Sequence, residues 1–391
     1  MARQYNVISA DSHLDINPAL WTHRVPAKVR DLAPKVVTLE DGADAIQIGA
    51  GRPRRISHLV HTGPKDQIHF QVFTFENAAG AGGPEKRLRE QDQDGIDAEV
   101  LYSAVGNVSV LREHEDNEVY LALNHAYNQY LAEEYAAAAP DRLFPLGVIP
   151  TTGVADAVKE LEYCARAGMK GVQIDKFPSG KGHPTPEDDR FWAASLDLGM
   201  PVSHHSDREI TRMNGPSEPT FSYTKGLTGP DASAFGGDPM RMWYFRFAGE
   251  GLCAPLQMAF AGVFDRFPNL QIYWGETMIG WLPYALIQVD SNYDRYEEMG
   301  ADLYGVESLE RRPSEYMRDH NFWGFLSDPF GVELRHKIGV DKLLWGSDFP
   351  HRASDWPHSR EAIERDFAEV SPDERYLMLA GNAIKFFHLD A

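Results

Sequence analysis

The sequence has little cysteine, little positive charge and no long apolar run, and each shortage excludes a class of protein. Its 391 residues include two cysteines, Cys164 and Cys253, whose spacing fits neither a disulfide framework nor a zinc ribbon. No apolar run approaches the length that spans a bilayer, and the N-terminal "MARQYNVISADSH" lacks the apolar core of a signal peptide. We therefore expect a cytoplasmic protein in a reducing compartment.

The shortage of positive charge excludes two kinds of partner. The chain has 58 acidic against 38 basic residues and a formal net charge of −20. Nucleic-acid binding depends on clustered Lys and Arg, and anionic membrane surfaces repel an acidic protein. We expect neither a nucleic acid nor a membrane as partner, whereas a small acidic substrate in a local basic pocket remains possible.

The apolar residues, 43% of the chain, are arranged in short runs separated by amphipathic segments. This alternation predicts parallel strands joined by helices, as in 117–139, 154–168 and 280–298. Eight strands are the count of a (β/α)₈ TIM-type barrel, and no Gly-rich phosphate turn of a doubly wound sheet follows the first one. We predict one α/β barrel domain over 1–391, with strands in 5–13, 98–103, 143–150, 169–175, 200–206, 270–276, 321–328 and 342–348.

Two long insertions interrupt this alternation. Residues 24–90 and 207–240 are rich in Gly and Pro, and both follow strands. In a barrel they would emerge over the C-terminal face, where active sites are built. We predict that they form lids or subunit contacts, in a homo-oligomer or in a hetero-oligomer with a paralogue.

Several predicted strands end on side chains that bind metals. In a closed barrel these ends converge on one face, so the set predicts a metal site. Alternation along a strand places Asp11 and His13 on the same side but His204 and His205 on opposite sides, and we assign His205 to the axis. The residues concerned are Asp11, His13, His204, His205, Glu276, Asp348 and His351.

Each of these residues has a plainer interpretation. A strand-end aspartate is often a turn residue or a helix cap, and "SD" in "WGSDFPH" fits that role. For Glu276 a cap or salt bridge is as good an explanation as a functional role, and His351 fits solvent or a contact with a ligand better than the metal itself. However, four strands would rarely end on such side chains by chance. The set of residues therefore supports a metal site more strongly than any one of them does.

The sequence resembles the amidohydrolase superfamily, in the branch of aminocarboxymuconate semialdehyde decarboxylase and the resorcylate-type decarboxylases. The segments that carry the resemblance run in family order over nearly the whole chain. They are "SADSHLD", "QDQDGIDAEVLY", "AAAAPDRLFPLGVIP", "AGMKGVQI", "LGMPVSHHS", "GVFDRFPNLQIYWGETMIGWLPY", "LLWGSDFPH" and "LAGNAIKFF".

The resemblance implies one divalent metal at the barrel mouth, with Asp348 also taking a proton from metal-bound water. The implied ligands are Asp11, His13, His205 and Asp348. Two positions depart from the family pattern. Asp11 stands where many relatives begin a His-x-His motif, and Glu276 stands where decarboxylases of the branch usually place a catalytic histidine.

Carboxylate ligands favour Mn²⁺ or Fe²⁺ over Zn²⁺ relative to an all-histidine site. They also allow a second metal. The side chains available for it are Glu276, His204 and His351.

We therefore predict a metal-dependent hydrolase or non-oxidative decarboxylase of a small carboxylated or cyclic substrate, with an aromatic ring favoured. Asp348 is the expected general base and Glu276 a second acid/base group. Candidate substrate contacts are Arg208, Arg352, Trp243, Tyr244 and Trp323, for which surface ion pairs or core packing are the alternatives. Two other functions remain open: a dinuclear iron or manganese oxygenase, and a metal-bearing but catalytically idle subunit.

Overall fold

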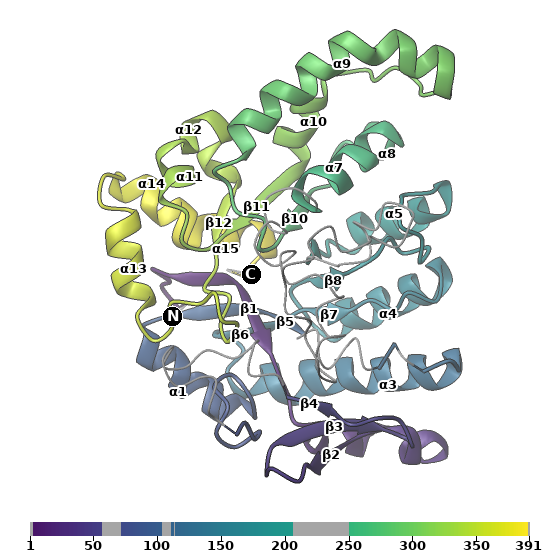
Figure 1. Ribbon diagram of the computed structural model, residues 1–391, viewed down its shortest axis with the longest axis vertical. Helices are drawn as coiled ribbons and strands as arrows, with labels where there is room; N and C mark the ends of the chain where they lie inside the picture. The colour runs from purple at the N-terminus through teal and green to yellow at the C-terminus, as the bar shows by residue number, and fades with distance from the viewer. Residues whose placement is uncertain (1–2, 57–71, 104–110, 113, 206–249, 390–391) are drawn as a thin grey trace, which may run out of the picture.

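The computed structural model describes residues 3–56, 72–103, 111–112, 114–205 and 250–389. Within them, eight parallel strand segments form the centre of the molecule, one in each segment predicted as a strand (Figure 1). They are short and buried along their whole length. Their bounds are β1 Ile8–Leu14, β5 Ala98–Ser103, β6 Leu143–Pro145 with β7 Gly147–Val148, β8 Val172–Ile174, β9 Val202–His204, β10 Ile272–Trp274, β11 Asn321–Phe325 and β12 Leu343–Trp345.

The strands follow one another in barrel order, β1-β5-β6 and then β7-β8-β9-β10-β11-β12. The two parts join at Leu146, between β6 and β7. The N–H of Leu146 donates to the carbonyl of Leu101 in β5 over 2.9 Å, and the N–H of Gly147 donates to the carbonyl of Gly171, just before β8, over 3.1 Å. At the opposite side β12 meets β1, and beyond the end of β12 the Asp348 N–H donates to the Asp11 carbonyl over 2.8 Å. The fold is therefore the predicted (β/α)₈ TIM-type barrel.

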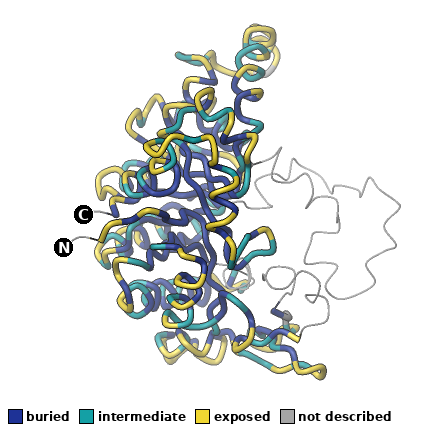
Figure 2. Tube along the Cα trace, turned by 90° about the vertical axis from the view of Figure 1, so that its left-hand side faces the viewer, coloured by how far each residue is buried: buried dark blue, intermediate teal, exposed yellow. Residues whose placement is uncertain are grey.

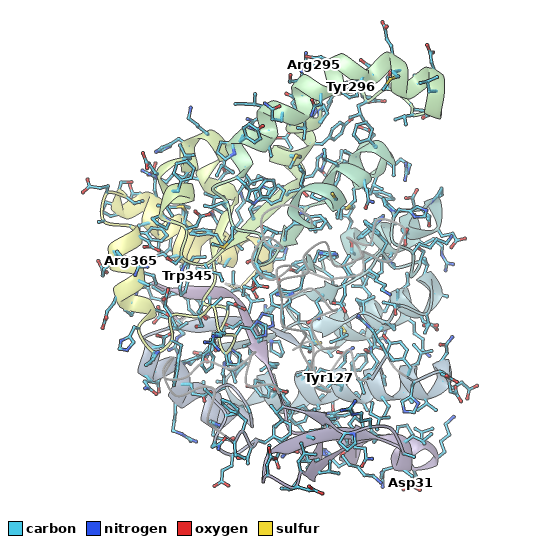
Figure 3. All side chains as sticks on the ribbon, in the orientation of Figure 1. Asp31, Tyr127, Arg295, Tyr296, Trp345 and Arg365 are labelled. Atoms are coloured by element: carbon cyan, nitrogen blue, oxygen red, sulfur yellow. The ribbon has the colours of Figure 1, made fainter. Side chains whose placement is uncertain are left out.

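Helices follow the strands and surround them, as the amphipathic segments predicted (Figure 1). The segment predicted at 117–139 is α3, Asn117–Tyr130, extended by a π-helical turn at Leu131–Tyr135. The longest helix, α9, extends away from the barrel, with Arg295 and Tyr296 on its outer part (Figure 3). Besides α3, the α-helices in the described residues are α1 Pro84–Asp94, α4 Val154–Arg166, α5 Asp189–Asp197, α7 Glu250–Phe260, α8 Val263–Arg266, α9 Leu282–Tyr304, α10 Pro313–His320, α11 Pro329–Glu333, α12 Arg335–Ile338, α13 Ser359–Asp366, α14 Pro372–Tyr376 and α15 Asn382–Phe387.

Buried side chains form two large clusters, and the strands contribute alternate residues to them. One cluster joins the outer faces of the strands to the surrounding helices. The other contains the inward residues of the strands and is completed by Phe386 and Phe387 of α15. Figure 2 shows the buried positions along the central strands and the exposed ones on the outer helices. The barrel is therefore packed with side chains at its centre, as expected for an eight-stranded barrel.

The insertion after β1 builds a small sheet of its own. Strands β2 Pro34–Thr38, β3 Asp44–Ile48 and β4 Arg54–Arg55 pair antiparallel in that order. Helix α1 begins at Pro84, inside the segment predicted as the first insertion. The second insertion, 207–240, lies outside the described residues. Among the residues described, no helix combines the length and apolar character needed to cross a bilayer.

Candidate metal centre

Asp11 and His13 reach the site because β1 changes its alternation. Ile8 and Ala10 point into the barrel, so strict alternation would turn Asp11 and His13 outward. The register of β1 against β5 shifts between Ser9 and Ser12, which reverses the pattern. The His13 Nε2 atom consequently lies 3.3 Å from Asp11 Oδ1, and both side chains are buried.

The adjacent histidines after β9 point in opposite directions, as predicted. His205 Nε2 lies 3.6 Å from Asp11 Oδ1, and its ring meets that of His13 edge to face with centroids 4.7 Å apart. The His204 ring packs against Trp274, 4.8 Å away, in the cluster between strands and helices. The two imidazoles therefore lie on opposite sides of the strand, and His204 belongs to neither donor group found among the described residues.

Glu276 and Asp348 approach from β10 and β12 with left-handed backbones, at φ 59° and 55°. Such angles cost energy in residues other than glycine and cluster at functional sites. Asp348 Oδ1 lies 3.2 Å from His13 Nε2, and Glu276 Oε2 lies 3.8 Å from His205 Nε2. The strained conformation carries both carboxylates toward the histidines that the other strands supply.

The charges of this cluster are strongly coupled. Burial alone would raise the pKa of Asp348, but His351 and His13 outweigh it and hold that pKa well below its usual range. Burial would lower the pKa of His13, but Asp11 and Asp348 raise it to about 9. Burial and His13 lower the pKa of His351 to about 4. Burial likewise opposes ionisation of Asp11, but His205 and His13 hold its pKa well below its usual range, so both aspartates are ionised at neutral pH.

The donor set fits a divalent cation. Both carboxylate oxygens of Asp11, both ring nitrogens of His13 and Nε2 of His205 are buried without a hydrogen-bond partner among the described residues. Buried polar atoms are almost always satisfied, and ligand atoms that face one ion are a regular exception. Two groups of donors are present, Asp11–His13–His205 and His13–Asp348–His351. Within each group the donor atoms all lie within 4.8 Å of one another. His13 belongs to both groups, so the two groups lie side by side in one buried cluster.

Glycines allow the strands to approach this closely. A Cβ atom at Gly346 would lie 2.6 Å from Asp11 Cβ, and one at Gly275 would lie 3.1 Å from Asp11 Oδ2. Side chains at either position would push β1 away from its neighbours.

We expect Gly346→Ala to lower the free energy of unfolding by about 1–3 kcal/mol, the usual cost of overpacking. Gly182→Ala is the matched control, because a Cβ atom at Gly182 would have open space around it. Urea denaturation of both variants measures the difference. Equal stability of the two would show that β1 moves aside without cost.

The structure places the remaining predicted residues in four different ways. His351 lies at the edge of the cluster, where its ring stacks on that of His13 at 3.8 Å and its Nδ1 lies 2.7 Å from Asp348 Oδ1. Arg352, directly after it, is partly exposed and stays a candidate. Trp323 is not at the mouth: it is buried in the outer cluster with its ring edge-on to Trp281, so its alternative, core packing, is correct. Arg208, Trp243 and Tyr244 lie outside the described residues.

Tyr102, in the interior of the barrel, supports the cluster and was not predicted from the sequence. The Tyr102 ring lies 4.8 Å from that of His205 and 5.9 Å from that of His13, and its hydroxyl hydrogen-bonds to Ser203 Oγ. Burial and the charge of Asp11 raise the pKa of Tyr102 well above its usual value, so this phenol stays neutral. A tyrosine inside a predicted strand carries no signal that separates this role from core packing.

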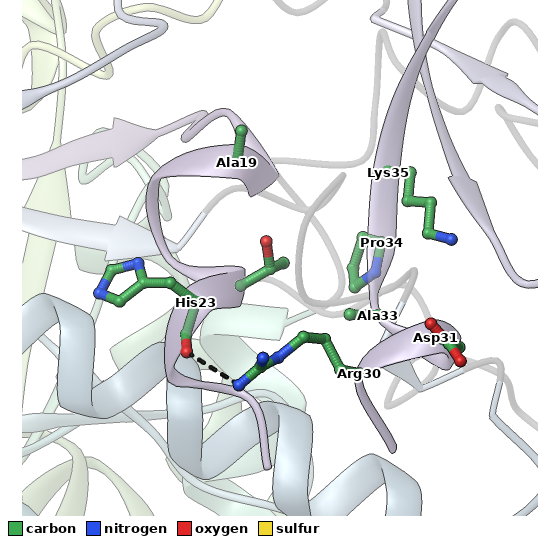
Figure 4. Close-up of a pocket in the computed structure, with 8 residues that line it drawn as sticks. Ala19, His23, Arg30, Asp31, Ala33, Pro34 and Lys35 are labelled. Carbon is green, nitrogen blue, oxygen red and sulfur yellow. Dashed lines mark hydrogen bonds between the residues drawn. The ribbon is translucent and has the colours of Figure 1, made fainter. Parts of the chain in front are cut away.

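A surface pocket of about 420 Å³ lies in the insertion after β1 (Figure 4). Arg30 closes one side by donating from Nη2 to the His23 carbonyl over 3.5 Å. Most of its lining is exposed, and it contains none of the residues of the metal cluster. We therefore do not assign the chemistry to this pocket.

The sequence matches the amidohydrolase family model over residues 21–389. The chain belongs to this family. A related decarboxylase, 2-amino-3-carboxymuconate-6-semialdehyde decarboxylase of Dictyostelium discoideum, is 24% identical over 324 residues, which cover 81% of this chain and 80% of that protein. This amidohydrolase-family chain thus aligns with a decarboxylase over most of its length.

Two solved structures support the barrel assignment. An amidohydrolase from Mycobacterium avium subsp. paratuberculosis superposes with a TM-score of 0.72 at 19% identity, covering 99% of this chain and 100% of that one. A 5-carboxyvanillate decarboxylase from Novosphingobium aromaticivorans, with bound manganese, has a TM-score of 0.65 at 16% identity, covering 98% and 97%. At these identities the likeness concerns the fold.

Proposed function

We propose that the protein is a divalent-metal-dependent, non-oxidative decarboxylase of a small, carboxylated aromatic substrate. The observation that carries the proposal is the buried cluster of unpartnered donors from Asp11, His13 and His205, with Asp348 beside it. The family relative of D. discoideum and the manganese-bearing structural neighbour are both decarboxylases. The proposal thus rests on a cation site and on the chemistry of relatives that share the fold.

We assign the metal to Asp11, His13, His205 and Asp348, with Glu276 as a further donor or as an acid/base group. When bound, the ion would polarise a substrate oxygen and lower the pKa of bound water toward neutrality. Carboxylate oxygens and imidazoles together suit Mn²⁺, Fe²⁺ or Zn²⁺. One ion per chain is expected, since both donor groups contain His13.

The protein's own groups would manage the proton. Loss of CO₂ from an aromatic acid breaks the ring–carboxylate bond, leaves its electron pair on the ring carbon and requires a proton at that carbon. Asp348, whose Oδ1 lies 2.7 Å from His351 Nδ1, is placed to take a proton from water in the site and give it to that carbon, and the hydroxide left behind would combine with the released CO₂ as bicarbonate. Glu276, on the His205 side, is the second group able to carry a proton.

The first experiment is the metal content of protein purified without added metal or chelator, measured by elemental mass spectrometry. We expect about one equivalent of manganese, zinc or iron per chain. The same protein should release CO₂ from at least one member of a panel of hydroxybenzoic acids, while boiled protein should not. A chain that binds no divalent metal even after incubation with Mn²⁺ would contradict the proposal.

Two alternatives give different results in that experiment. About two equivalents including iron, with oxygen uptake, would indicate the dinuclear oxygenase. A metal-bearing chain with no activity that co-purifies with a paralogue of similar size would indicate the idle subunit. We expect instead a homo-oligomer in the cytoplasm, with the insertions at 24–90 and 207–240 as lids or subunit contacts.

A further inference from the structure

Arg87 of α1 is a fully buried arginine that lies beside the metal cluster without belonging to it. Its guanidinium meets Glu99 of β5 in a two-point contact, Nε to Oε2 at 2.7 Å and Nη2 to Oε1 at 2.9 Å. Gln91 donates to the same Glu99 over 2.6 Å. The ion pair therefore fixes the plane and position of the guanidinium against the outside of β5.

The other donors of Arg87 go to the backbone beside two proposed ligands. Nη1 donates to the carbonyl of His13 over 2.9 Å, and Nη2 reaches the carbonyl of Phe349, the residue after Asp348, over 3.4 Å. The guanidinium also lies 4.6 Å from the centre of the Phe349 ring. One side chain thus connects the segment that carries His13 to the segment that carries Asp348.

These two segments form the seam where the barrel closes. No strand ladder pairs β12 with β1 in the described residues. The seam is held instead by backbone bonds beyond the end of β12 and by three hydroxyls, Ser9, Ser12 and Ser347, within 2.8–3.1 Å of one another. Because Asp11 and His13 lie on one side of the seam and Asp348 on the other, its width sets the spacing of the ligands.

We propose that Arg87 is a positioning residue of the metal centre, which holds the Asp348 segment at a fixed distance from the β1 ligands. The proposal rests on the metal site of the proposed function. If this position required only packing, an apolar side chain would serve as well. Only the planar guanidinium group, with its several N–H donors, can bind Glu99 and two carbonyls at the same time. Outer groups that orient metal ligands commonly change metal affinity by 10–100-fold when they are removed.

Three variants of the full-length chain test the proposal. Arg87→Met combined with Glu99→Gln removes the guanidinium group without leaving a buried charge unpaired. Arg87→Lys keeps the positive charge, but an ammonium group cannot make all the contacts of the guanidinium. Arg142→Met is the matched control, because Arg142 pairs with Asp92 of the same helix but has no hydrogen bond to a ligand-bearing segment in the described residues. If the double variant does not fold, the lysine variant and the control still decide the question.

The readouts are the dissociation constant for Mn²⁺, from the EPR signal of the free ion, and the visible absorption of the Co²⁺-substituted protein. We expect about 10–100-fold weaker Mn²⁺ binding and an altered Co²⁺ spectrum for the double variant, an intermediate value for Arg87→Lys and no change for Arg142→Met. Folded variants with wild-type Mn²⁺ affinity and Co²⁺ spectrum would overturn the positioning role. Failure of the wild-type chain to bind Mn²⁺ would instead overturn the proposed function.

Discussion

Replacing Asp348 by asparagine is expected to lower turnover by about 10²–10⁴-fold, the contribution typical of a positioned general acid or base. The amide has nearly the same shape as the carboxylate, so the fold should persist. It cannot accept a proton, however. The His351 ring would also lose its charged partner, since its Nδ1 lies 2.7 Å from Asp348 Oδ1.

Metal content must be measured on the same sample, because Asp348 is also a proposed ligand. Retained metal with lost turnover would separate the proton-transfer role from the ligand role. Asp189→Asn is a suitable control, since Asp189 forms an exposed ion pair with Arg266, and such pairs contribute about 0–1 kcal/mol. A folded Asp348→Asn protein with full activity would refute the proposed base.

The sequence could predict that Asp11, His13, His205 and Asp348 lie at the same end of the barrel, because this depends only on topology. Parallel strands in a barrel end on the same face, whatever the details of their packing. The opposite directions of His204 and His205 follow from the period of an extended strand. In a regular strand, sequence position therefore gives the direction of a side chain, as for His204 and His205, whereas the roles of these residues at a metal stay predictions.

The supporting features could not be predicted, because they depend on irregular backbone or on long-range contacts. The register shift between Ser9 and Ser12 is invisible in "ISADSHL", and alternation counted from Ile8 would have sent Asp11 outward. The contacts of Arg87 join α1 to β5, to β1 and to the loop after β12, and Phe349 in that loop is 262 positions from Arg87. No local pattern encodes such a contact.

Trp323 illustrates a third kind of limit. An aromatic residue in a barrel strand can face the mouth, the interior or the helices, and composition does not distinguish these positions. In the structure it faces the helices, where it packs against Trp281. Its direction depends on the register of β11 against β10, which pairs Trp274 with Trp323.

The neighbouring histidines after β9 provide the sharpest test of the metal centre. We expect His205→Ala to weaken Mn²⁺ binding by more than about 100-fold, the upper end of the cost of losing an outer partner, and to abolish turnover. His204→Ala removes the same ring one residue away, on the other side of the strand. It should leave Mn²⁺ affinity unchanged, because His204 contacts Trp274 rather than the cluster.

Both substitutions leave a cavity, so both variants should lose stability. His204→Ala should lose more, because burial and the neighbouring His205 lower the pKa of His204 to about 3 and the ring is packed as a neutral core group at pH 7. Titration with Mn²⁺ and thermal unfolding of the metal-free proteins measure the two effects separately. Equal loss of Mn²⁺ affinity in both variants would mean that the effect comes from damage to β9, and the assignment of His205 as a ligand would then fail.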